Sequence, residues 1–293
     1  MNFNSGKEII DLCNTQNKKI YDLMIEREME LQDITAAEIR ENMLVSLNIM
    51  KKAIDDSITK DIKSISGLIG GDAKKIYQNE SVIGGSVCGS LMKKAIAYSM
   101  GVLEVNASMG KIVAAPTAGS SGIIPGTLIA LQEEHSLSET DIINALITSS
   151  AIGLIVSKNA TVAGAEGGCQ AETGTAAAMA AGAIVEMMGG TVEQSFHAAA
   201  TSLKNILGLV CDPIAGLVEA PCEKRNAIGA SNALISAEMA LCGVESIIPF
   251  DEVVDAMYKI GRSLPFELKE TALGGLADTE TGRRIKKEIH DYK

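Results

Sequence analysis

The sequence predicts a mainly α-helical protein in which many helices are joined by glycine-rich loops. Three observations predict this class. Only 3% of the 293 residues are aromatic while 46% are hydrophobic, so the interior must be built from Ala, Ile, Leu, Val and Met. Apolar residues recur at helical spacing, and many of the 28 glycines lie between the helical segments. Such a composition favours close-packed helices over a sheet, which needs β-branched and aromatic residues.

The first 70 residues are charged and amphipathic. Ile9, Cys13, Ile20 and Met24 recur at helical spacing, and Thr35-Ala-Ala-Glu38 is a capping box that starts a further helix. We therefore expect two long helices, with solvated charged faces, in an N-terminal helical arm over residues 1–70. The composition then shifts toward Gly, Ala, Ser and Thr, which indicates a second unit over residues 71–293.

Helices alternate with glycine-rich connections in this second unit. Ser138 with Asp141 and Thr191 with Gln194 have the spacing of capping boxes, so a helix is expected to begin at each. One short strand is expected, over Lys111 to Ala115. The expected helices are 86–100, 123–134, 139–157, 172–188, 192–207, 226–242, 251–260 and 281–291.

Two uncharged runs are long enough to raise the question of a membrane span. The run from Ile112 to Gln132 contains Pro116 and Pro125 among glycines and hydroxyl residues, so its backbone would be unsatisfied in lipid. We interpret it as a buried or active-site loop that leads into a helix. The run from Ile142 to Ser157 is shorter than the ~18 apolar residues of a span, and we expect a core helix.

The charge of the chain excludes polyanionic partners. A formal net charge of −11 and a pI near 4.9 argue against nucleic acid, which is bound by clustered Lys and Arg, and against an anionic membrane surface. The N-terminus lacks a basic segment followed by an apolar one, so we expect no secretory signal and a cytoplasmic location.

Half of the cysteines lie in polar, glycine-rich or proline-containing loops. These are Cys169, Cys211 and Cys222, whereas Cys13, Cys88 and Cys242 lie in apolar helical contexts. Three loop thiolates suit an iron–sulfur cluster with one iron left open, or a zinc site with one open position. The spacing contains no C-x-x-C pair, so three packed thiols remain an equal alternative on these grounds.

The segments around these cysteines carry a resemblance to a known family. The chain resembles the iron–sulfur-dependent L-serine dehydratases of bacteria from about Gly84 to Gly282. The matching segments are Ala115-Pro-Thr-Ala-Gly-Ser-Ser-Gly122, Glu166-Gly-Gly-Cys-Gln-Ala-Glu172, Leu209-Val-Cys-Asp-Pro213, Ala220-Pro-Cys-Glu-Lys-Arg-Asn226 and Lys269-Glu-Thr-Ala-Leu-Gly-Gly-Leu-Ala277.

The resemblance implies a multi-helix catalytic domain that converts L-serine to pyruvate and ammonia. It also implies a 4Fe-4S cluster bound by Cys169, Cys211 and Cys222. The open iron of that cluster would act as a Lewis acid on the substrate hydroxyl. Because no regulatory region fits in the remaining residues, the chain is similar to the α subunit of the two-chain type, and a β subunit that carries the regulatory region is the expected partner.

Removal of the α-proton of serine requires a base, and two lysines are candidates. Lys158 interrupts an uncharged stretch beside Asn159, a candidate substrate contact, and desolvation can lower the pKa of a lysine toward neutrality. The alternative for Lys158 is a helix-end lysine that satisfies terminal carbonyls. Lys111, ahead of the Thr117 loop, is the second candidate.

Hydroxyl and second-layer groups complete the predicted site. Thr117, Ser120 and Ser121 precede a helix start near Gly122, where the helix dipole favours the substrate carboxylate. The alternative for that loop is an ordinary capped turn. Three polar residues flank the cysteines and could orient the ligands or simply pin their loops; they are Asp212, Arg225 and Asn226.

Three other functions are weighed against this one. A pyridoxal phosphate enzyme would leave the loop cysteines idle, and no glycine-rich phosphate cup lies beside Lys158. A cysteine desulfidase of the same superfamily would use a similar cluster, and it is separated by the signature segments. A non-enzymatic iron–sulfur sensor is disfavoured because no basic DNA-binding face is present.

Overall fold

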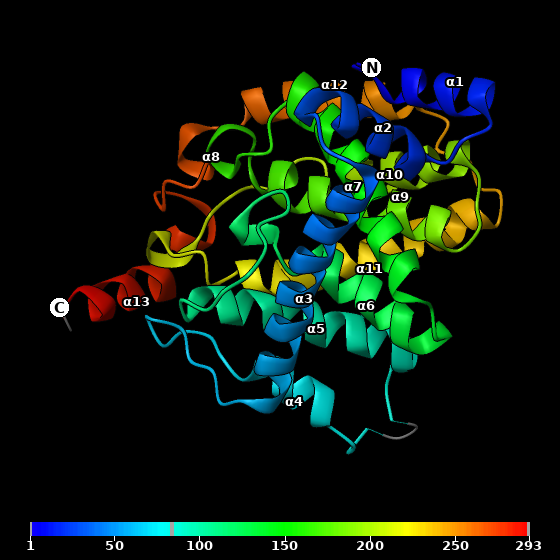
Figure 1. Cartoon of the computed structure of the whole chain (residues 1–293). Helices are drawn as coiled ribbons and strands as arrows, with labels where there is room; N and C mark the ends of the chain where they lie inside the picture. The colour runs from blue at the N-terminus through cyan, green and yellow to red at the C-terminus, as the bar shows by residue number, and fades with distance from the viewer. Residues whose placement is uncertain (1, 83–84, 292–293) are drawn as a thin grey trace.

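The computed structural model describes residues 2–82 and 85–291, and this part of the chain is helical with no named strand (Figure 1). The N-terminal helices are α1 (Gly6–Gln16), α2 (Ile20–Gln32), α3 (Ala36–Thr59) and α4 (Asp72–Gln78). The rest are α5 (Gly89–Ala107), α6 (Ile123–His135), α7 (Glu139–Asn159), α8 (Gly164–Gly167), α9 (Thr175–Met187), α10 (Val192–Lys204), α11 (Cys222–Leu241), α12 (Phe250–Ser263) and α13 (Glu280–Asp291). The mainly α-helical fold is therefore confirmed.

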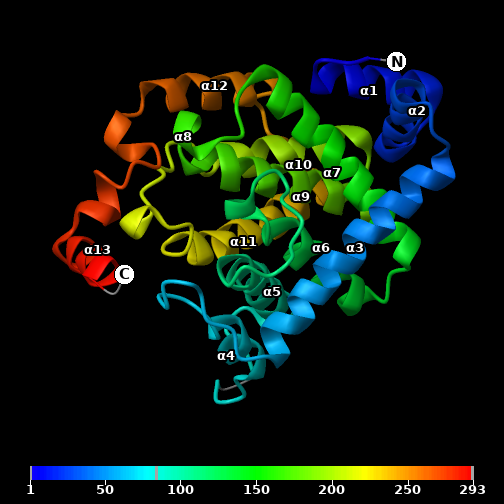
Figure 2. The same ribbon diagram turned by 60° about the vertical axis from the view of Figure 1, so that its left-hand side comes forward.

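Helix α9 is the centre of the protein. Its residues from Thr175 to Glu186 are all buried, and it packs against α6, α7, α10 and α11 (Figure 2). Alanine and glycine dominate its sequence, because larger side chains would not fit between so many neighbours. At Gly182, for example, an added Cβ would lie 2.2 Å from the Ile152 side chain. The small residues predicted to build the interior thus allow helices to approach closely.

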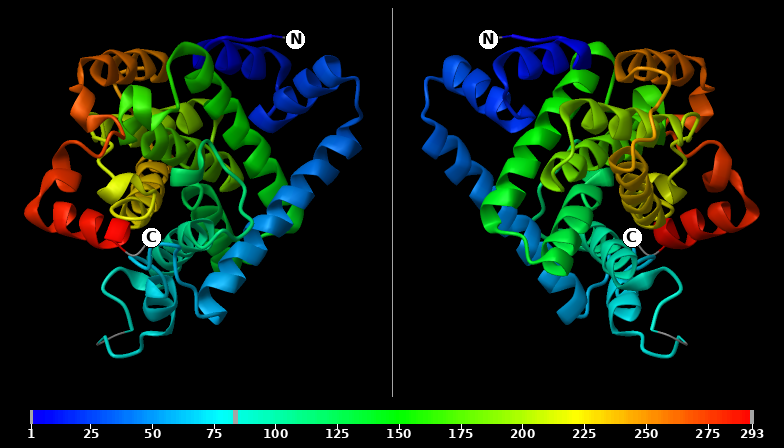
Figure 3. Two further views of the ribbon diagram at one scale, coloured as in Figure 1. Left: turned by 90° about the vertical axis from the view of Figure 1, so that its left-hand side faces the viewer. Right: turned by 90° about the vertical axis from the view of Figure 1, so that its right-hand side faces the viewer.

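The N-terminal arm packs on the same core. Helix α3 crosses the outside of the molecule and contacts α5, while α2 contacts α7 (Figure 3). One continuous hydrophobic cluster runs from Phe3 through Leu23 and Leu47 to Met257. The division of the chain at residue 70 remains an interpretation of its composition.

The helix starts marked by capping boxes are confirmed. Thr35, Ser138 and Thr191 each accept a hydrogen bond from the backbone of the third helical residue, which returns a side-chain bond to the cap. The helix expected over 86–100 continues to Ala107 as α5, and the other expected helices are found with ends shifted by a few residues. The loop expected ahead of Ile123 is also found, and it leads into α6.

Two expectations about local structure are wrong. Residues 111–115 form no strand, because this segment has no backbone partner to pair with among the described residues. The arm contains three helices rather than two, since Asn17 adopts the left-handed conformation (φ 50°) and ends α1 before α2 begins.

Helix α7 is long and apolar enough to cross a membrane by length and composition alone. In the structure, 67% of its most apolar window is buried inside the protein. The surrounding α2, α9 and α6 provide that cover. These contacts agree with the core helix expected from the sequence.

Substitution of Gly122 by Ala should disrupt the packing of α6 on α5. An added Cβ would lie 1.9 Å from the carbonyl oxygen of Ser99, and backbone cannot move aside as a side chain can. We expect Gly122→Ala to lower the free energy of unfolding by about 3 kcal/mol or more in urea denaturation.

Gly153→Ala is the matched control for this variant. Its added Cβ would meet only the flexible Met179 side chain, and alanine has the better helix propensity by about 1 kcal/mol. The control should remain within about 1 kcal/mol of the wild type. Equal destabilisation of both variants would contradict the tight α5–α6 contact.

Candidate functional site

Three buried thiols from three separate segments lie close to one another. Cys169 precedes a π-helical turn (Gln170–Gly174), Cys211 lies in the connection after α10, and Cys222 is the first residue of α11. Their exposed fractions are 5%, 3% and 7%. The Gln170 amide donates to the Leu209 carbonyl (3.0 Å), and Arg225 bonds to residues on both sides of Cys211, so the three cysteine segments meet in one place, called the cysteine centre below.

The segment of Cys169 is fixed by its glycine and its glutamine. Gly168 has a φ of 77°, and a Cβ there would lie 2.8 Å from the carbonyl oxygen of Leu209, so only glycine fits. The buried Gln170 side chain donates to the carbonyls of Gly167 and Met257 and accepts from the amide of Gly208. Cys169 is thereby tied to α8, α12 and the chain after α10.

Cys211 is held by its own backbone. Its amide donates to the Leu268 carbonyl (2.9 Å), and its carbonyl accepts from the Glu270 amide (2.7 Å). These bonds form an isolated parallel bridge between Cys211 and Lys269. The segment 268–270, called the strap below, therefore brings the matching segment that begins at Lys269 to the cysteine centre.

Asn226 joins the Cys222 segment to the loop before α6. Its amide nitrogen donates to the carbonyls of Gly119 (2.8 Å) and Cys222 (2.9 Å), and its oxygen accepts from the Gly122 amide (3.0 Å). The side chain is fully buried. Asn226 thus bonds to backbone groups of two segments, and loss of any of these bonds inside the protein would be costly.

Arg225 and Asp212 form a buried ion pair behind the thiols. The guanidinium donates to the Asp212 carboxylate (2.7 Å) and to the Val210 carbonyl (2.9 Å), and Asp212 also accepts from the Leu276 amide (2.7 Å). The positive charge of Arg225 opposes the burial that raises the pKa of the thiols of Cys169 and Cys222. The pair therefore both fixes the Cys211 loop and supplies positive charge.

Glu172 places a buried carboxyl group between a hydroxyl group and a thiol. Its Oε1 accepts from the Thr117 hydroxyl (2.6 Å), and its Oε2 lies 3.9 Å from the sulfur of Cys211. Burial raises the pKa of this carboxyl, while the Thr117 hydrogen bond opposes the increase. Gly119 and Gly164 leave room for it, because a Cβ at either would lie within 3.2 Å of its oxygens.

Burial makes the free thiols hard to ionise. Burial is the largest of the causes that raise the pKa of each thiol. For Cys222, burial together with the charges of Cys169 and Glu172 raises the pKa to about 12. Three adjacent thiolates would repel one another in a site that excludes water. A positively charged centre among them would reverse this preference, as metal binding to cysteine does.

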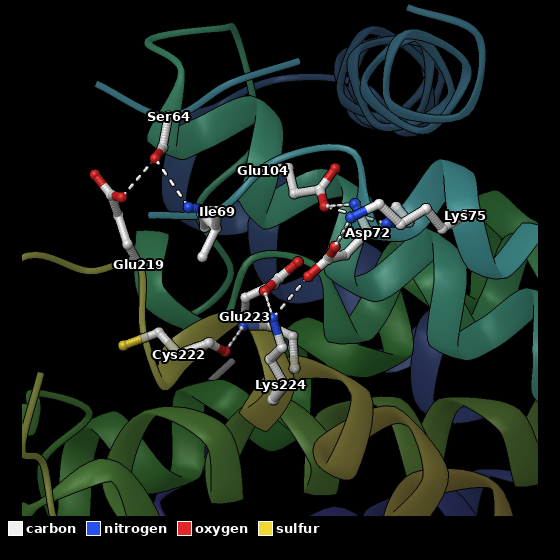
Figure 4. Close-up of polar contacts among 11 residues, drawn as sticks. Ser64, Ile69, Asp72, Lys75, Glu104, Glu219, Cys222, Glu223 and Lys224 are labelled. Carbon is white, nitrogen blue, oxygen red and sulfur yellow. Dashed lines mark hydrogen bonds and ion pairs between the residues drawn. The ribbon is translucent and has the colours of Figure 1, made fainter. Parts of the chain in front are cut away.

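Three buried acidic side chains, Glu104, Glu219 and Glu223, lie near Cys222, whose sulfur points away from them (Figure 4). Glu104 accepts from the amides of Asp72 (2.7 Å) and Ala73 (3.1 Å) at the start of α4. Burial and the nearby Glu104 raise the pKa of Glu223 to about 7, while Lys224 opposes this. Glu219 accepts from the hydroxyl groups of Ser64 and Ser66, so this group anchors residues 64–73 to the Cys222 segment.

The hydroxyl residues of the 117–122 loop are brought to the cysteine centre. Thr117 contacts Glu172, and the Ser120 hydroxyl lies 3.2 Å from that of Thr117. Ser121 is fully buried, and its hydroxyl donates to the Ala118 carbonyl. The amides of Ser121 and Gly122 already have protein partners, and Thr117 is the residue of this loop whose side chain bonds to Glu172.

Lys158 and Asn159 are placed elsewhere, at the end of α7. The ammonium of Lys158 donates to Asn2 (2.8 Å), to the Phe3 carbonyl (2.8 Å) and to Asn4 (3.1 Å). The Asn159 amide donates to the Asn4 carbonyl (2.7 Å). Both residues tie the N-terminal segment to α7, so their contacts support the structural alternative for Lys158.

Lys111 is exposed and has no hydrogen bond or ion pair to any residue in the described ranges.

Three residues at the cysteine centre were not predicted from the sequence: Glu172, Thr173 and Glu270. The thiol of Cys169 lies 3.1 Å from the Thr173 hydroxyl, and the charge of Glu270 raises the pKa of Cys211. A signal was present for Glu172, an acid three residues after Cys169 in an Ala- and Gly-rich segment.

A single metal ion does not fit these side chains as they stand. Within residues 2–82 and 85–291, no group of three His, Cys, Asp or Glu side chains is arranged to hold one ion. A cubane cluster is a different case, since each thiolate binds a different iron and the sulfurs lie further apart. The donor set itself, three buried thiols without a histidine, is of the kind that binds iron–sulfur clusters.

Comparisons with known proteins give one consistent family. The family model described as serine dehydratase alpha chain matches residues 15–277. The L-serine dehydratase alpha chain of Peptoniphilus asaccharolyticus is 51% identical over 98% of both chains. A probable L-serine dehydratase alpha chain of Bacillus subtilis is 50% identical over 98% of this chain and 95% of its own. The L-serine dehydratase of Streptomyces coelicolor is 36% identical over 94% of this chain but only 60% of its own.

Asn226→Asp should destabilise the cysteine centre although it preserves the shape of the side chain. The new carboxylate would face two carbonyl oxygens with no proton to donate. We expect the free energy of unfolding to fall by at least about 2 kcal/mol in urea denaturation. Asn48→Asp, at an exposed position on α3, is the control and should change it little. An unchanged stability of Asn226→Asp would show that these three bonds do not hold the loops together.

Proposed function

Because the chain belongs to the serine dehydratase alpha chain family, we propose that it is an L-serine ammonia-lyase, which converts L-serine to pyruvate and ammonia. The reaction eliminates water across Cα and Cβ, and the resulting aminoacrylate tautomerises and is hydrolysed. The observation that carries the proposal is the convergence of Cys169, Cys211 and Cys222, buried, on one centre. The family signatures surround each of the three.

We propose that these three thiolates bind a 4Fe-4S cluster. The fit rests on the donor set, three buried thiols that come together without a histidine, and positive charge among them would favour their ionised form. When bound, such a cluster with one iron free of protein ligands supplies a Lewis acid for the departing hydroxyl. No net redox change is required, because the reaction is an elimination followed by hydrolysis.

The residues of the chain itself would orient the substrate and exclude water. Thr117, Ser120 and Ser121 are the proposed contacts of the serine carboxylate; Thr117 donates to Glu172, and the Ser120 hydroxyl lies beside that of Thr117. Asp212, Arg225 and Asn226 would hold the cysteine loops in register through the bonds described above. A rigid surround of this kind reduces the reorganisation that the elimination would otherwise require.

The α-proton base remains a prediction for both lysines. Three oxygens of the N-terminal segment accept hydrogen bonds from the Lys158 ammonium and hold it at the end of α7. Lys111 lies six residues before Thr117 and has no such partners among the residues that the structure covers. Comparison of the two variants therefore separates the two candidates.

We further propose a β-chain partner and a cytoplasmic location. The names of the relatives that this chain matches over nearly their full length designate an alpha chain. Single-chain relatives named L-serine dehydratase are matched over 94% of this chain but only 60–62% of their own length. A separate chain would supply the remainder in the two-chain type.

Anaerobically prepared protein should contain about four irons per chain and should release pyruvate from L-serine. Cys169→Ala, Cys211→Ala and Cys222→Ala should each lose both iron and turnover, because each removes one ligand. The matched control is Cys242→Ala, whose exposed thiol lies outside the cysteine centre and should be dispensable. Full iron content in any of the first three variants would overturn the ligand assignment. Release of sulfide from L-cysteine in preference to pyruvate from L-serine would overturn the proposed substrate.

Replacement of Lys158 by Ala should leave α-deuterium exchange of serine intact. The expected cost is structural, about 1 kcal/mol of stability from the lost bonds to an exposed segment. Exchange is followed by NMR in deuterated buffer, with Lys111→Ala measured in parallel. Loss of exchange in Lys158→Ala with unchanged iron content would instead identify Lys158 as the base.

A further inference from the structure

We propose that a cavity between α8, α12 and the strap binds a small zwitterionic amino acid at a second site, separate from the cysteine centre. The cavity has a volume of about 390 Å³, which exceeds the size of such a molecule. Its lining consists of Thr161, Ala165, Glu166, Tyr258, Arg262 and Lys269.

The charged side chains of this cavity have no partners in the described part of the chain. Every other arginine makes an ion pair or a side-chain hydrogen bond: Arg27, Arg40, Arg225, Arg283 and Arg284. Arg262 makes none, and the same holds for Lys269, for Glu166 and for the Tyr258 hydroxyl. In a chain of net charge −11, two cations that share a cavity and form no ion pair within the described residues are available to a ligand.

The pattern of charge identifies the class of ligand. Arg262 and Lys269 together suit one carboxylate, and a guanidinium can bind it through two parallel hydrogen bonds. Glu166 lies in the same cavity and suits an ammonium group. A ligand with both groups a few ångströms apart satisfies all three side chains, whereas a simple carboxylate would leave Glu166 unpaired and repelled.

Two elements separate this cavity from the cysteine centre. In α8, Gly164 faces Glu172 and the sulfur of Cys211, whereas the next two residues, Ala165 and Glu166, line the cavity. In the strap, the charge of Glu270 acts on the thiols, whereas Lys269 lines the cavity. Among the described residues, no lining side chain forms a hydrogen bond or an ion pair with a cysteine of the centre.

The same two elements connect the cavity to the ligands of the centre. The backbone of the strap is bonded to Cys211 on both sides, and α8 leads directly to Gly168 and Cys169. Helix α12, which carries Tyr258 and Arg262, packs against α8. A ligand that joins Arg262, Lys269 and Glu166 would therefore restrain both cysteine segments from outside. The site is suited to regulate the reactivity of the centre.

The test measures binding to the anaerobically prepared full chain by saturation-transfer NMR, with L-alanine and propionate as probes. L-alanine has both charges but no β-hydroxyl to lose, and propionate lacks the ammonium group. We expect L-alanine to bind, and Arg262→Gln and Lys269→Gln each to weaken its binding about tenfold. Glu166→Gln should weaken L-alanine but not propionate. The matched control is Lys259→Gln, on the same helix but paired with Asp255, and it should have no effect.

Several results would overturn the proposal. These are equal L-alanine affinities in the wild type and in Arg262→Gln, tighter L-alanine binding by Glu166→Gln, or L-alanine binding abolished by Thr117→Ala, which would place the probe at the cysteine centre. No turnover is measured, so the binding result does not depend on whether the chain acts on L-serine. A protein without serine turnover that still binds L-alanine through Arg262 would refute the proposed function alone.

Discussion

The burial of three adjacent thiols is the constraint on which the rest of the structure depends. Burial raises the pKa of the thiols of Cys169, Cys211 and Cys222, and charge on Cys169 raises the pKa of the other two further. The three come from segments far apart in sequence, so nothing local holds them together. Polar side chains buried around them do so: Gln170, Asn226 and the Arg225–Asp212 pair each bond to backbone of a different segment. The preorganised thiols are then ready for a positive centre, which would stabilise their ionised form.

The helical body makes this arrangement possible because small side chains at the helix contacts let its helices pack closely. Helix α9 consists largely of Ala and Gly, and Gly122 lets α6 lie against the backbone of α5. Close helix packing fixes the ends of the loops that carry the cysteines. The N-terminal arm adds a second layer, since α3 braces α5 and the Lys158 ammonium holds the first residues against α7. The most tightly packed helices thus lie at the two ends of the segments that carry the cysteines.

Much of this could be predicted from the sequence, and the remainder could not for physical reasons. Helix positions followed from periodicity, and the ends at Thr35, Ser138 and Thr191 followed from local capping chemistry. The gathering of Cys169, Cys211 and Cys222 rested on the resemblance, because their spacing alone left packed thiols equally possible. The environment of Lys158 was beyond reach, since its partners lie about 155 residues away. Glu172 was overlooked because its importance comes from Thr117 and Cys211, contacts that only the folded chain creates.

The central claim is that the cysteine centre holds a cluster in which one iron is open to L-serine. The most direct measurement is the Mössbauer spectrum of anaerobically prepared, iron-57-enriched protein, recorded before and after the addition of L-serine. The account predicts that about one iron in four changes its isomer shift and quadrupole splitting while the others keep theirs. A spectrum in which no iron responds to L-serine would contradict it.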